Sequence, residues 1–242
     1  MKTCAAIACR AYSTRLFGKP LQLVGDRPIL THLLDQMKQA KRLDEIVLAI
    51  SEGPDSGLFI EYAREHGYKY VVGAGRDVQY RLIMAAESVG ADVILRNTSE
   101  NPFIYWENID EIIERHIANG NDFTVTEKLP IAAFVEVVST AALKRAHDLG
   151  DERTRSELVM LYIAEHPDQF KIDRVAPPAD LARPEIRFAV DDPMDLLMIR
   201  KMWDAVNNGR KFVPLKELID YWDQDADVAR VLSTGEILTL WS

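Results

Sequence analysis

Residues 5–20 read Ala5-Ala6-Ile7-Ala8-Cys9-Arg10-Ala11-Tyr12-Ser13-Thr14-Arg15-Leu16-Phe17-Gly18-Lys19-Pro20. An apolar strand runs into a loop of small residues that carries three cations, Arg10, Arg15 and Lys19. Small residues allow backbone N–H groups to converge on an anion, and the cations supply charge for a polyphosphate. The stretch lacks the first glycine and the final hydroxyl of a G-x-x-x-x-G-K-[ST] phosphate loop. It therefore predicts a nucleotide-binding loop of another type, the alternative being a solvated basic loop.

The size and charge of the chain restrict the ligands that it can take. Its 242 residues, 48% of them hydrophobic, are enough for one large α/β domain, which we expect to span 1–242. A formal net charge of −9 repels nucleic acid, so a local basic loop favours a small anionic substrate. Cys4 and Cys9 lie too far apart along an extended strand for a disulfide. Because no stretch has the pattern of a signal peptide or a membrane span, we expect a cytoplasmic protein without a membrane partner.

Short apolar runs alternate with helical periodicity in the first part of the chain. Nearly continuous apolar strands between helices are typical of a parallel sheet that is covered on both sides. The sequence therefore predicts an α/β fold with a mostly parallel, Rossmann-like sheet and helices on both faces. Such sheets bind ligands beyond the carboxyl ends of their strands, where the basic loop lies. The predicted strands are 3–8, 46–50, 70–72 and 93–95, and the predicted helices are 29–37 (with Pro28 at its first position), 58–66 and 78–89.

The second half of the chain has a less regular pattern. The proline-rich stretch 177–184 is typical of an internal loop. Residues 216–242 are interpreted as a C-terminal helical extension that packs on the core or on another subunit. The other predicted elements are a helix over 106–117, strands over 123–126 and 133–138, and helices over 140–149 and 156–165.

Two acidic segments follow predicted strands at the ligand edge of the sheet. The first is Arg96-Asn97-Thr98-Ser99-Glu100-Asn101-Pro102, and the second begins with an apolar strand at 187–190 and continues as Asp191-Asp192-Pro193-Met194-Asp195. Asp192 precedes a proline and fits a helix N-cap, while Asp195 fits the first helical turn. Asp191 has no such structural duty. Carboxylates beside a triphosphate suit Mg²⁺, so Glu100 and Asp191 are the candidate metal ligands.

The opening pattern R-x-x-S-T-R-L-x-G-K resembles the cytidylyltransferases that activate acidic sugars. That branch contains CMP-sialate synthetases, KDO cytidylyltransferase and spore-coat polysaccharide cytidylyltransferases. The resemblance covers residues 1–200 and implies a fold of the nucleotide-diphospho-sugar transferase type. In the family, one metal-binding aspartate follows the fourth strand and another follows a later strand. Asp191 matches the second, whereas Glu100 stands in the place of the first, with Ser99 where the family has glycine.

The same resemblance assigns residues to the two substrates. Residues 73–81, Gly73-Ala74-Gly75-Arg76-Asp77-Val78-Gln79-Tyr80-Arg81, are similar to the family's G-x-x-x-D-V-x-x-R region beside the nucleotide, although Asp77 equally fits a helix N-cap. The candidate nucleotide-binding residues are Ala8, Arg10, Ala11, Ser13, Thr14, Arg15, Lys19, Asp77 and Arg81. The candidate acceptor-binding residues are Arg96, Glu136, Glu157 and Tyr162.

The function that the resemblance implies is transfer of CMP from CTP to an acidic sugar of the nonulosonate or deoxyoctulosonate type. Pyrophosphate is released, and the product serves surface polysaccharide biosynthesis. Arg10, Arg15 and Lys19 are the catalytic candidates, because cations stabilise the charge that develops as pyrophosphate leaves. The alternatives are a phosphonate or phosphorylated metabolite as acceptor, a metal-dependent nucleotide-sugar glycosyltransferase, and a non-catalytic nucleotide-binding protein.

The resemblance also implies a homodimer formed through the less regular half of the chain. Phe134, Val135, Val137 and Val138 offer an apolar strand for that contact. A buried core strand is the alternative interpretation of the same residues.

Overall fold

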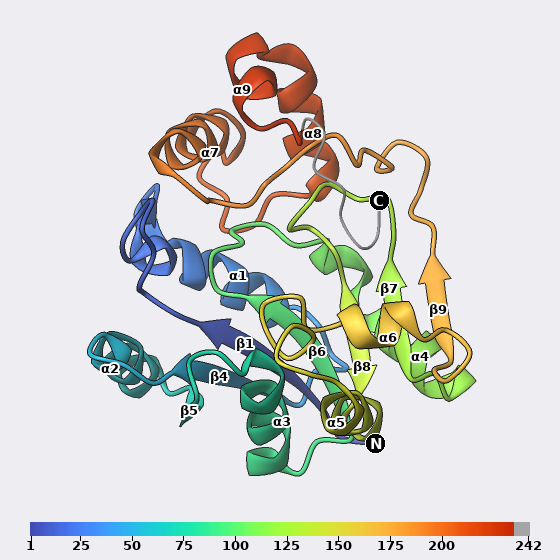
Figure 1. Cartoon of the computed structure of the whole chain (residues 1–242). Helices are drawn as coiled ribbons and strands as arrows, with labels where there is room; N and C mark the ends of the chain where they lie inside the picture. The colour runs from blue at the N-terminus through green and yellow to red at the C-terminus, as the bar shows by residue number, and fades with distance from the viewer. Residues whose placement is uncertain (235–242) are drawn as a thin grey trace.

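A seven-stranded sheet forms the centre of the molecule in the computed structural model, which describes residues 1–234 (Figure 1). The strand order is β5-β4-β1-β6-β8-β7-β9, and β8 is antiparallel to both of its neighbours while the other neighbouring pairs are parallel. The predicted mostly parallel α/β sheet is therefore confirmed. The strands are β1 (Thr3–Cys9), β4 (Glu45–Ser51), β5 (Lys69–Gly73), β6 (Val93–Thr98), β7 (Phe123–Thr126), β8 (Glu136–Ser139) and β9 (Ile172–Val175), with a separate antiparallel ribbon of β2 (Leu23–Val24) and β3 (Arg27–Pro28).

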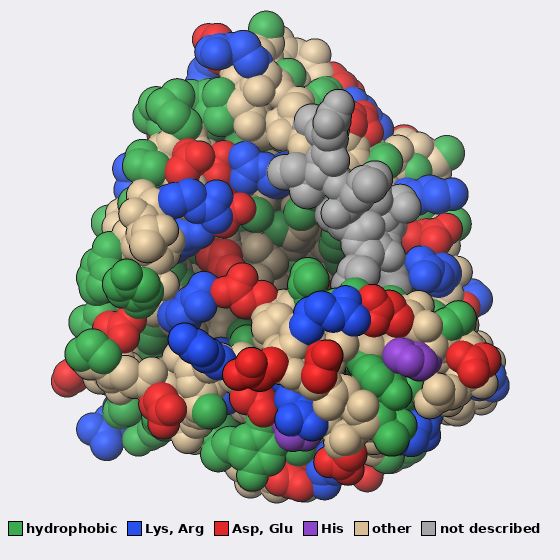
Figure 2. Space-filling view, viewed as in Figure 1, with side chains coloured by type: hydrophobic (Ala, Val, Ile, Leu, Met, Phe, Trp, Pro, Cys, Tyr) green, Lys and Arg blue, Asp and Glu red, His purple; other side chains and the backbone are tan. Residues whose placement is uncertain are grey.

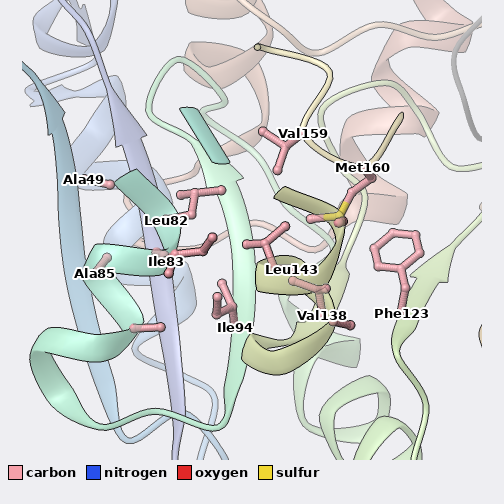
Figure 3. Close-up of a cluster of buried hydrophobic side chains, with 14 of the residues drawn as sticks. Ala49, Leu82, Ile83, Ala85, Ile94, Phe123, Val138, Leu143, Val159 and Met160 are labelled. Carbon is pink, nitrogen blue, oxygen red and sulfur yellow. The ribbon is translucent and has the colours of Figure 1, made fainter. Parts of the chain in front are cut away.

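Strand β1 is buried on both faces, because a layer of helices covers each side of the sheet. Ala6 and Ala8 belong to the core under α3 and α5, which Figure 3 shows in close-up. Ala5 and Ile7, at the alternate positions, belong to the core under α1, α2 and α4. The helices on both faces that the sequence predicts are thus present. They are α1 (Ile29–Met37), α2 (Ser56–His66), α3 (Val78–Val89), α4 (Ile109–Asn119), α5 (Thr140–Leu149) and α6 (Leu161–Glu165).

A third core belongs to the C-terminal helices α7 (Pro193–Val206), α8 (Leu215–Gln224) and α9 (Ala226–Val231). Val24 and Phe188 join this core, so the ribbon and the segment before α7 pack against these helices. Figure 1 shows the three helices beyond one end of the sheet and the N-terminus, where β1 begins, at the other. They therefore face the carboxyl ends of the parallel strands. The extension predicted over 216–242 contributes most of α8 and all of α9, and 235–242 lies outside the described residues.

The start of α7 is a capping box built from the run of acids in the sequence. The Asp192 side chain accepts hydrogen bonds from the N–H groups of Met194 and Asp195, as predicted for an N-cap. Asp195 in turn accepts from the N–H groups of Asp191 and Asp192, at 2.8 and 3.1 Å. The buried Asp195 carboxylate also accepts two hydrogen bonds from the Arg187 guanidinium, at 2.5 and 2.8 Å. Asp195 thus fixes the helix end to the segment that precedes it.

At the starts of α6 and α1 the predictions are wrong, because tertiary contacts decide the local conformation. The helix predicted over 156–165 begins at Leu161. The chain before it turns around the start of α3, where the Arg155 carbonyl accepts hydrogen bonds from the N–H groups of Val78 and Gln79. Pro28 has an extended ψ of 149° and pairs with Leu23 in the ribbon, so it caps α1 instead of occupying the first helical position.

Other differences concern the less regular half. The strand predicted over 133–138 begins only at Glu136 and ends one residue later, at Ser139, because a turn with Ala132 at φ 78° precedes it. The strand predicted at 187–190 is an extended segment in which Arg187 makes an isolated bridge to Ile131. The helix predicted over 106–117 is a 3-10 turn, η2 (Trp106–Asn108), followed by α4. Strand β9 was not predicted, since its sequence IDRV places charged residues inside a short strand.

Two expectations from composition can be compared with the structure. Cys4 and Cys9 are both free and buried in β1, as their spacing predicts. Within residues 1–234, no helix combines the length and the apolar character needed to cross a bilayer.

We expect Asp195→Ala to lower the free energy of unfolding by about 3–5 kcal/mol, because it leaves the largely buried Arg187 charge without its partner. Asp192→Ala is the matched control at the same helix end. It removes an N-cap alone and should cost about 1 kcal/mol. Urea denaturation followed by circular dichroism measures both variants. Equal losses would contradict the role of Asp195 in joining the two segments.

Candidate active site

A cavity of about 330 Å³ opens at the carboxyl edge of the sheet. Figure 2 shows a hollow rimmed by Lys, Arg, Asp and Glu side chains below the C-terminal helices. Its walls come from the loops after β1 and β6, the start of α3 and the segment before α7. The predicted site residues that it brings together are Ala8, Arg10, Ser13, Thr14, Arg15, Lys19, Arg81, Arg96, Glu100, Glu157 and Asp191.

The basic loop after β1 is closed by a backbone hydrogen bond across its base. The N–H of Gly18 donates to the carbonyl of Ala11 at 2.9 Å. Gly18 has a φ of 64°, in the left-handed region that favours glycine. The chain then enters a 3-10 turn, η1 (Lys19–Leu21), which holds Lys19 in a buried position. The Gly18 hydrogen bond and the buried Lys19 thus anchor the end of the loop, while Tyr12, Arg15 and Phe17 are exposed to solvent.

Asp191 is the acid on which three cations converge. Its Oδ1 accepts hydrogen bonds from Nζ of Lys19 at 2.8 Å and from Nη2 of Arg15 at 3.0 Å. Nη1 of Arg187 lies 3.7 Å from its Oδ2. Burial by itself would raise the pKa of Asp191, but the hydrogen bond from Lys19 and the charges of the three cations outweigh it and hold the pKa below its ordinary value. Asp191 is therefore ionised at neutral pH.

Glu100 lies beside Asp191, but its pKa is shifted in the opposite direction. Burial raises the pKa of Glu100, and the charges of Lys19 and Arg96 oppose that shift without cancelling it. The N–H of Val190 lies 3.5 Å from the Glu100 carbonyl oxygen, so the two acidic segments are adjacent. Within residues 1–234, no three His, Cys, Asp or Glu side chains gather as a complete metal site. A cation held by the two carboxylates therefore needs further oxygens from water or from a ligand.

Two further arginines of the cavity are paired with glutamates. Nη2 of Arg10 donates to Oε1 of Glu157 at 2.5 Å, and both side chains are more than half exposed. Nη1 of Arg96 donates to Oε2 of Glu136 at 2.7 Å, across the antiparallel pair of β6 and β8. Arg96 also donates to the Glu157 carbonyl at 3.4 Å. The segment that carries Glu157 thus contacts both arginines.

Asp77 and Arg81, the two predicted site residues near the start of α3, have different surroundings. Asp77 caps the helix with its side chain and pairs with Nε2 of His147 at 2.8 Å. The N-cap interpretation of Asp77 is confirmed, while its contact with a nucleotide stays a prediction. Arg81, one turn further on, is buried and lines the cavity. Its Nη1 donates to the carbonyls of Ala74 and Gly75.

Four predicted site residues lie outside the lining of the cavity, namely Ala11, Asp77, Glu136 and Tyr162. Ala11 is buried beneath the basic loop. Tyr162 stacks on His166 with ring centroids 4.0 Å apart and packs against the core. Of the four, Glu136 stays connected to the cavity through its ion pair with Arg96.

Several residues of the cavity were not predicted from the sequence. Tyr12, Val78 and Thr98 line the cavity, and each lies within a segment or next to a residue that was selected. Arg187 was also missed, although its spacing of four residues from Asp191 was an available signal. Lining side chains without charge carry no chemical pattern of their own, which explains their omission.

The strand expected at a dimer contact is buried within the single chain. Val135, Val137 and Val138 are completely covered, and β8 lies between β6 and β7. The core-strand interpretation is confirmed, and the predicted dimer surface is wrong because the sheet and its helices cover these side chains. A homodimer stays a prediction without an assigned surface.

Comparison with known proteins places these features in a family context. The chain matches the cytidylyltransferase family model over residues 5–236. It is 31% identical to an uncharacterized protein of Methanocaldococcus jannaschii, over 96% of this chain and 95% of that protein. It is 29% identical to the spore coat polysaccharide biosynthesis protein SpsF of Bacillus subtilis, over 92% of this chain and 95% of that protein. A solved cytidylyltransferase from Leptospira borgpetersenii shares the fold, with a TM-score of 0.86 and 20% identity over 99% of this chain and 100% of that one.

We expect Lys19→Ala and Arg15→Ala to weaken CTP binding while the fold stays intact. A charge-assisted contact to phosphate contributes roughly 1.5–3 kcal/mol, which is about a 10- to 150-fold change in dissociation constant. Lys144→Ala is the control, because it removes a surface cation of α5 that is paired with Glu87. Calorimetric titration measures the affinities. Unchanged CTP binding in both loop variants would refute the nucleotide-loop interpretation.

Proposed function

The chain belongs to the cytidylyltransferase family and is a CTP-dependent nucleotidyltransferase, and from this premise we propose that it transfers CMP to an acidic sugar with release of pyrophosphate. One observation carries the proposal. Cations and carboxylates meet in a single cavity at the carboxyl edge of the sheet, among them Arg10, Arg15, Lys19, Glu100 and Asp191. Cations suit a triphosphate, and carboxylates suit a divalent metal ion beside it.

In the proposed reaction an acceptor oxygen attacks the α-phosphorus of CTP, and the bond to pyrophosphate breaks. Lys19 and Arg15 stabilise the negative charge that grows on the leaving group, since both are cations that line the cavity. Arg10 contributes in the same way once a phosphate replaces Glu157 as its partner. No nucleophile from the protein is needed, because positioning and electrostatics supply most of the catalysis in this class of reaction.

We further propose that Glu100 and Asp191 hold a Mg²⁺ ion. The donor set fits this hard cation, because both side chains are carboxylates on adjacent segments beside the cations that suit phosphate. When bound, Mg²⁺ neutralises charge on the phosphate oxygens. Lys19 and Arg15 keep Asp191 ionised before the ligands arrive, and they also hold its carboxylate in one orientation.

The proposed acceptor is an acidic sugar destined for a surface polysaccharide. Support comes from the resemblance of the opening motif and from SpsF, whose name assigns it to spore coat polysaccharide biosynthesis. Arg96 is the candidate for binding the acceptor carboxylate, because it lines the cavity and its Nε is buried without a partner. The Glu136 carboxylate and the Glu157 carbonyl hold its other nitrogens.

Pyrophosphate release from CTP with a panel of acceptors tests this proposal. We expect turnover with a nonulosonate or a deoxyoctulosonate and none with a neutral hexose, because the cavity offers arginines to a carboxylate. Turnover confined to phosphonates or phosphorylated metabolites would show that the acceptor is one of these compounds and not an acidic sugar. Consumption of a sugar nucleotide would favour a glycosyltransferase, and the absence of any turnover would favour a non-catalytic nucleotide-binding protein.

The two metal candidates are separated by substitution. We expect Asp191→Asn to keep the fold but to lower turnover severely, because it removes a charge beside the ion. If Glu100 is a direct ligand, Glu100→Gln lowers apparent Mg²⁺ affinity and turnover together, and Glu100→Asp recovers part of both. If Glu100 acts through a water, Glu100→Gln is mild. Magnesium titrations of pyrophosphate release measure these effects, and nearly wild-type activity in Asp191→Asn would overturn the metal site.

The pH dependence of the same titrations reports on Glu100. Since burial raises the pKa of Glu100, this group takes up a proton at a higher pH than an ordinary glutamate. The apparent Mg²⁺ affinity should therefore fall as the pH is lowered through that raised pKa, while Asp191, with its lowered pKa, is still ionised. In Glu100→Gln this part of the pH dependence should disappear.

A further inference from the structure

Glu157 is the carboxylate of the cavity to which the proposed reaction assigns no chemical step. Among residues 1–234, the carboxylates that line the cavity are those of Glu100, Asp191 and Glu157, and no histidine lines it. Glu100 and Asp191 are the proposed metal ligands. The Glu157 side chain is 70% exposed and is paired with Arg10. Glu157 is therefore the remaining carboxylate of the cavity wall that can accept a proton from a substrate.

The backbone around Glu157 is held in place, whereas its side chain is exposed. The Arg155 carbonyl accepts hydrogen bonds from the first two N–H groups of α3, at 2.9 and 3.2 Å. The Gln79 side chain donates to the Val159 carbonyl at 2.6 Å. These bonds fix the chain on both sides of Glu157 to the start of α3. Among residues 1–234 the Glu157 carboxylate is held by Arg10 alone, so a change of partner at Arg10 releases the side chain without moving the segment that carries it.

The ion pair between Arg10 and Glu157 is one that a triphosphate can break. Nη2 of Arg10 donates to Oε1 of Glu157 at 2.5 Å, and more than half of each side chain is exposed. An exposed ion pair contributes little stability, whereas a charge-assisted contact to phosphate is among the stronger hydrogen bonds. A phosphate that binds Arg10 therefore leaves the Glu157 carboxylate without its cation, on the wall of the cavity where the reaction takes place.

Glu157 also adjoins the arginine that we propose to bind the acceptor. Nη2 of Arg96 donates to the Glu157 carbonyl oxygen at 3.4 Å, so the two residues are neighbours on the cavity wall. Nonulosonates and deoxyoctulosonates are 2-keto sugar acids, in which the anomeric hydroxyl and the carboxylate are attached to the same carbon atom. An acceptor whose carboxylate binds Arg96 therefore brings its reactive hydroxyl close to Glu157. Glu136 is engaged by Nη1 of Arg96 and does not line the cavity.

We propose that Glu157 is the general base of the reaction and that nucleotide binding releases it from Arg10. This inference rests on the proposed function. The Glu157 carboxylate takes the proton of the acceptor hydroxyl while the hydroxyl oxygen forms its bond to the α-phosphorus of CTP. The bond between the α-phosphorus and pyrophosphate breaks, and its electron pair leaves with pyrophosphate. Glu157 then gives the proton to water. Because the base is paired with a cation until a triphosphate binds, it becomes available only when there is a phosphorus atom to attack.

Pyrophosphate release from CTP and a deoxyoctulosonate, together with calorimetric titration of CTP, tests this assignment on the full chain. We expect Glu157→Gln to lower kcat by about 100- to 10,000-fold, the contribution of a positioned base. The amide keeps the size of the side chain but cannot take the proton. CTP should bind at least as tightly as to the wild-type protein, because it no longer displaces a carboxylate from Arg10. Glu152→Gln is the matched control, since Glu152 is an exposed acid of the same segment that does not line this cavity, and it should keep the wild-type kcat.

Rescue by a small carboxylate separates a chemical role of Glu157 from a structural one. Glu157→Ala leaves space for formate beside the acceptor hydroxyl. We expect sodium formate to restore part of the turnover of this variant, in comparison with sodium chloride at the same ionic strength. Glu152→Ala should show no such response to formate.

A kcat of Glu157→Gln near the wild-type value would overturn the assignment, and so would a Glu157→Ala variant that formate does not accelerate. An increase confined to the KM of the acceptor would identify Glu157 as a binding residue only. A CTP affinity that falls in step with turnover would identify a contact to the nucleotide, and both of these outcomes also overturn the assignment. A wild-type protein that binds CTP but releases no pyrophosphate with any acidic sugar would refute the proposed function, and the assignment with it.

Discussion

The burial of β1 on both faces is the constraint from which the site follows. Ala6 and Ala8 face one core, while Ala5 and Ile7 face the other. A charged side chain at any of these positions would be buried without water or a partner, which is costly. No residue of β1 is charged, and Arg10 directly follows its last residue. Because β4 and β6 flank β1 in parallel, the polar segments that follow these strands meet at the same edge. The cavity is thus a consequence of how the apolar residues are packed.

In the structure, carboxylates of the protein are the partners of the cations that we propose to bind phosphate. Lys19 and Arg15 share Asp191, and Arg10 pairs with Glu157. This arrangement balances the cations without a ligand. A triphosphate that takes over Lys19 and Arg15 leaves the Asp191 carboxylate free for a metal ion, so binding of nucleotide and metal is expected to be mutually reinforcing. In the proposed reaction, Asp191 is a counter-ion before the ligands bind and a metal ligand afterwards.

The sequence was sufficient for those features that depend on local pattern. The basic loop follows a buried strand, and the N-cap at Asp192 with Asp195 in the first turn needs only their spacing, so these placements were predicted correctly. The pair of Arg10 and Glu157 joins positions 147 residues apart, so no short stretch of sequence could predict it. The helix expected over 156–165 failed for the same reason, because the contact of Arg155 with α3 overrides the helical periodicity of its neighbours.

The structural roles predicted for Asp192 and Asp195 are confirmed, but the candidate metal ligand Asp191 is not independent of them. Asp195 accepts the N–H of Asp191 at 2.8 Å and binds the Arg187 guanidinium, which in turn lies 3.7 Å from the Asp191 carboxylate. The buried ion pair of Arg187 and Asp195 therefore sets both the backbone position and the electrostatic surroundings of the candidate metal ligand. Stability at the start of α7 and placement of Asp191 are properties of one network, so a residue that contacts no substrate still determines where the proposed metal ion can sit.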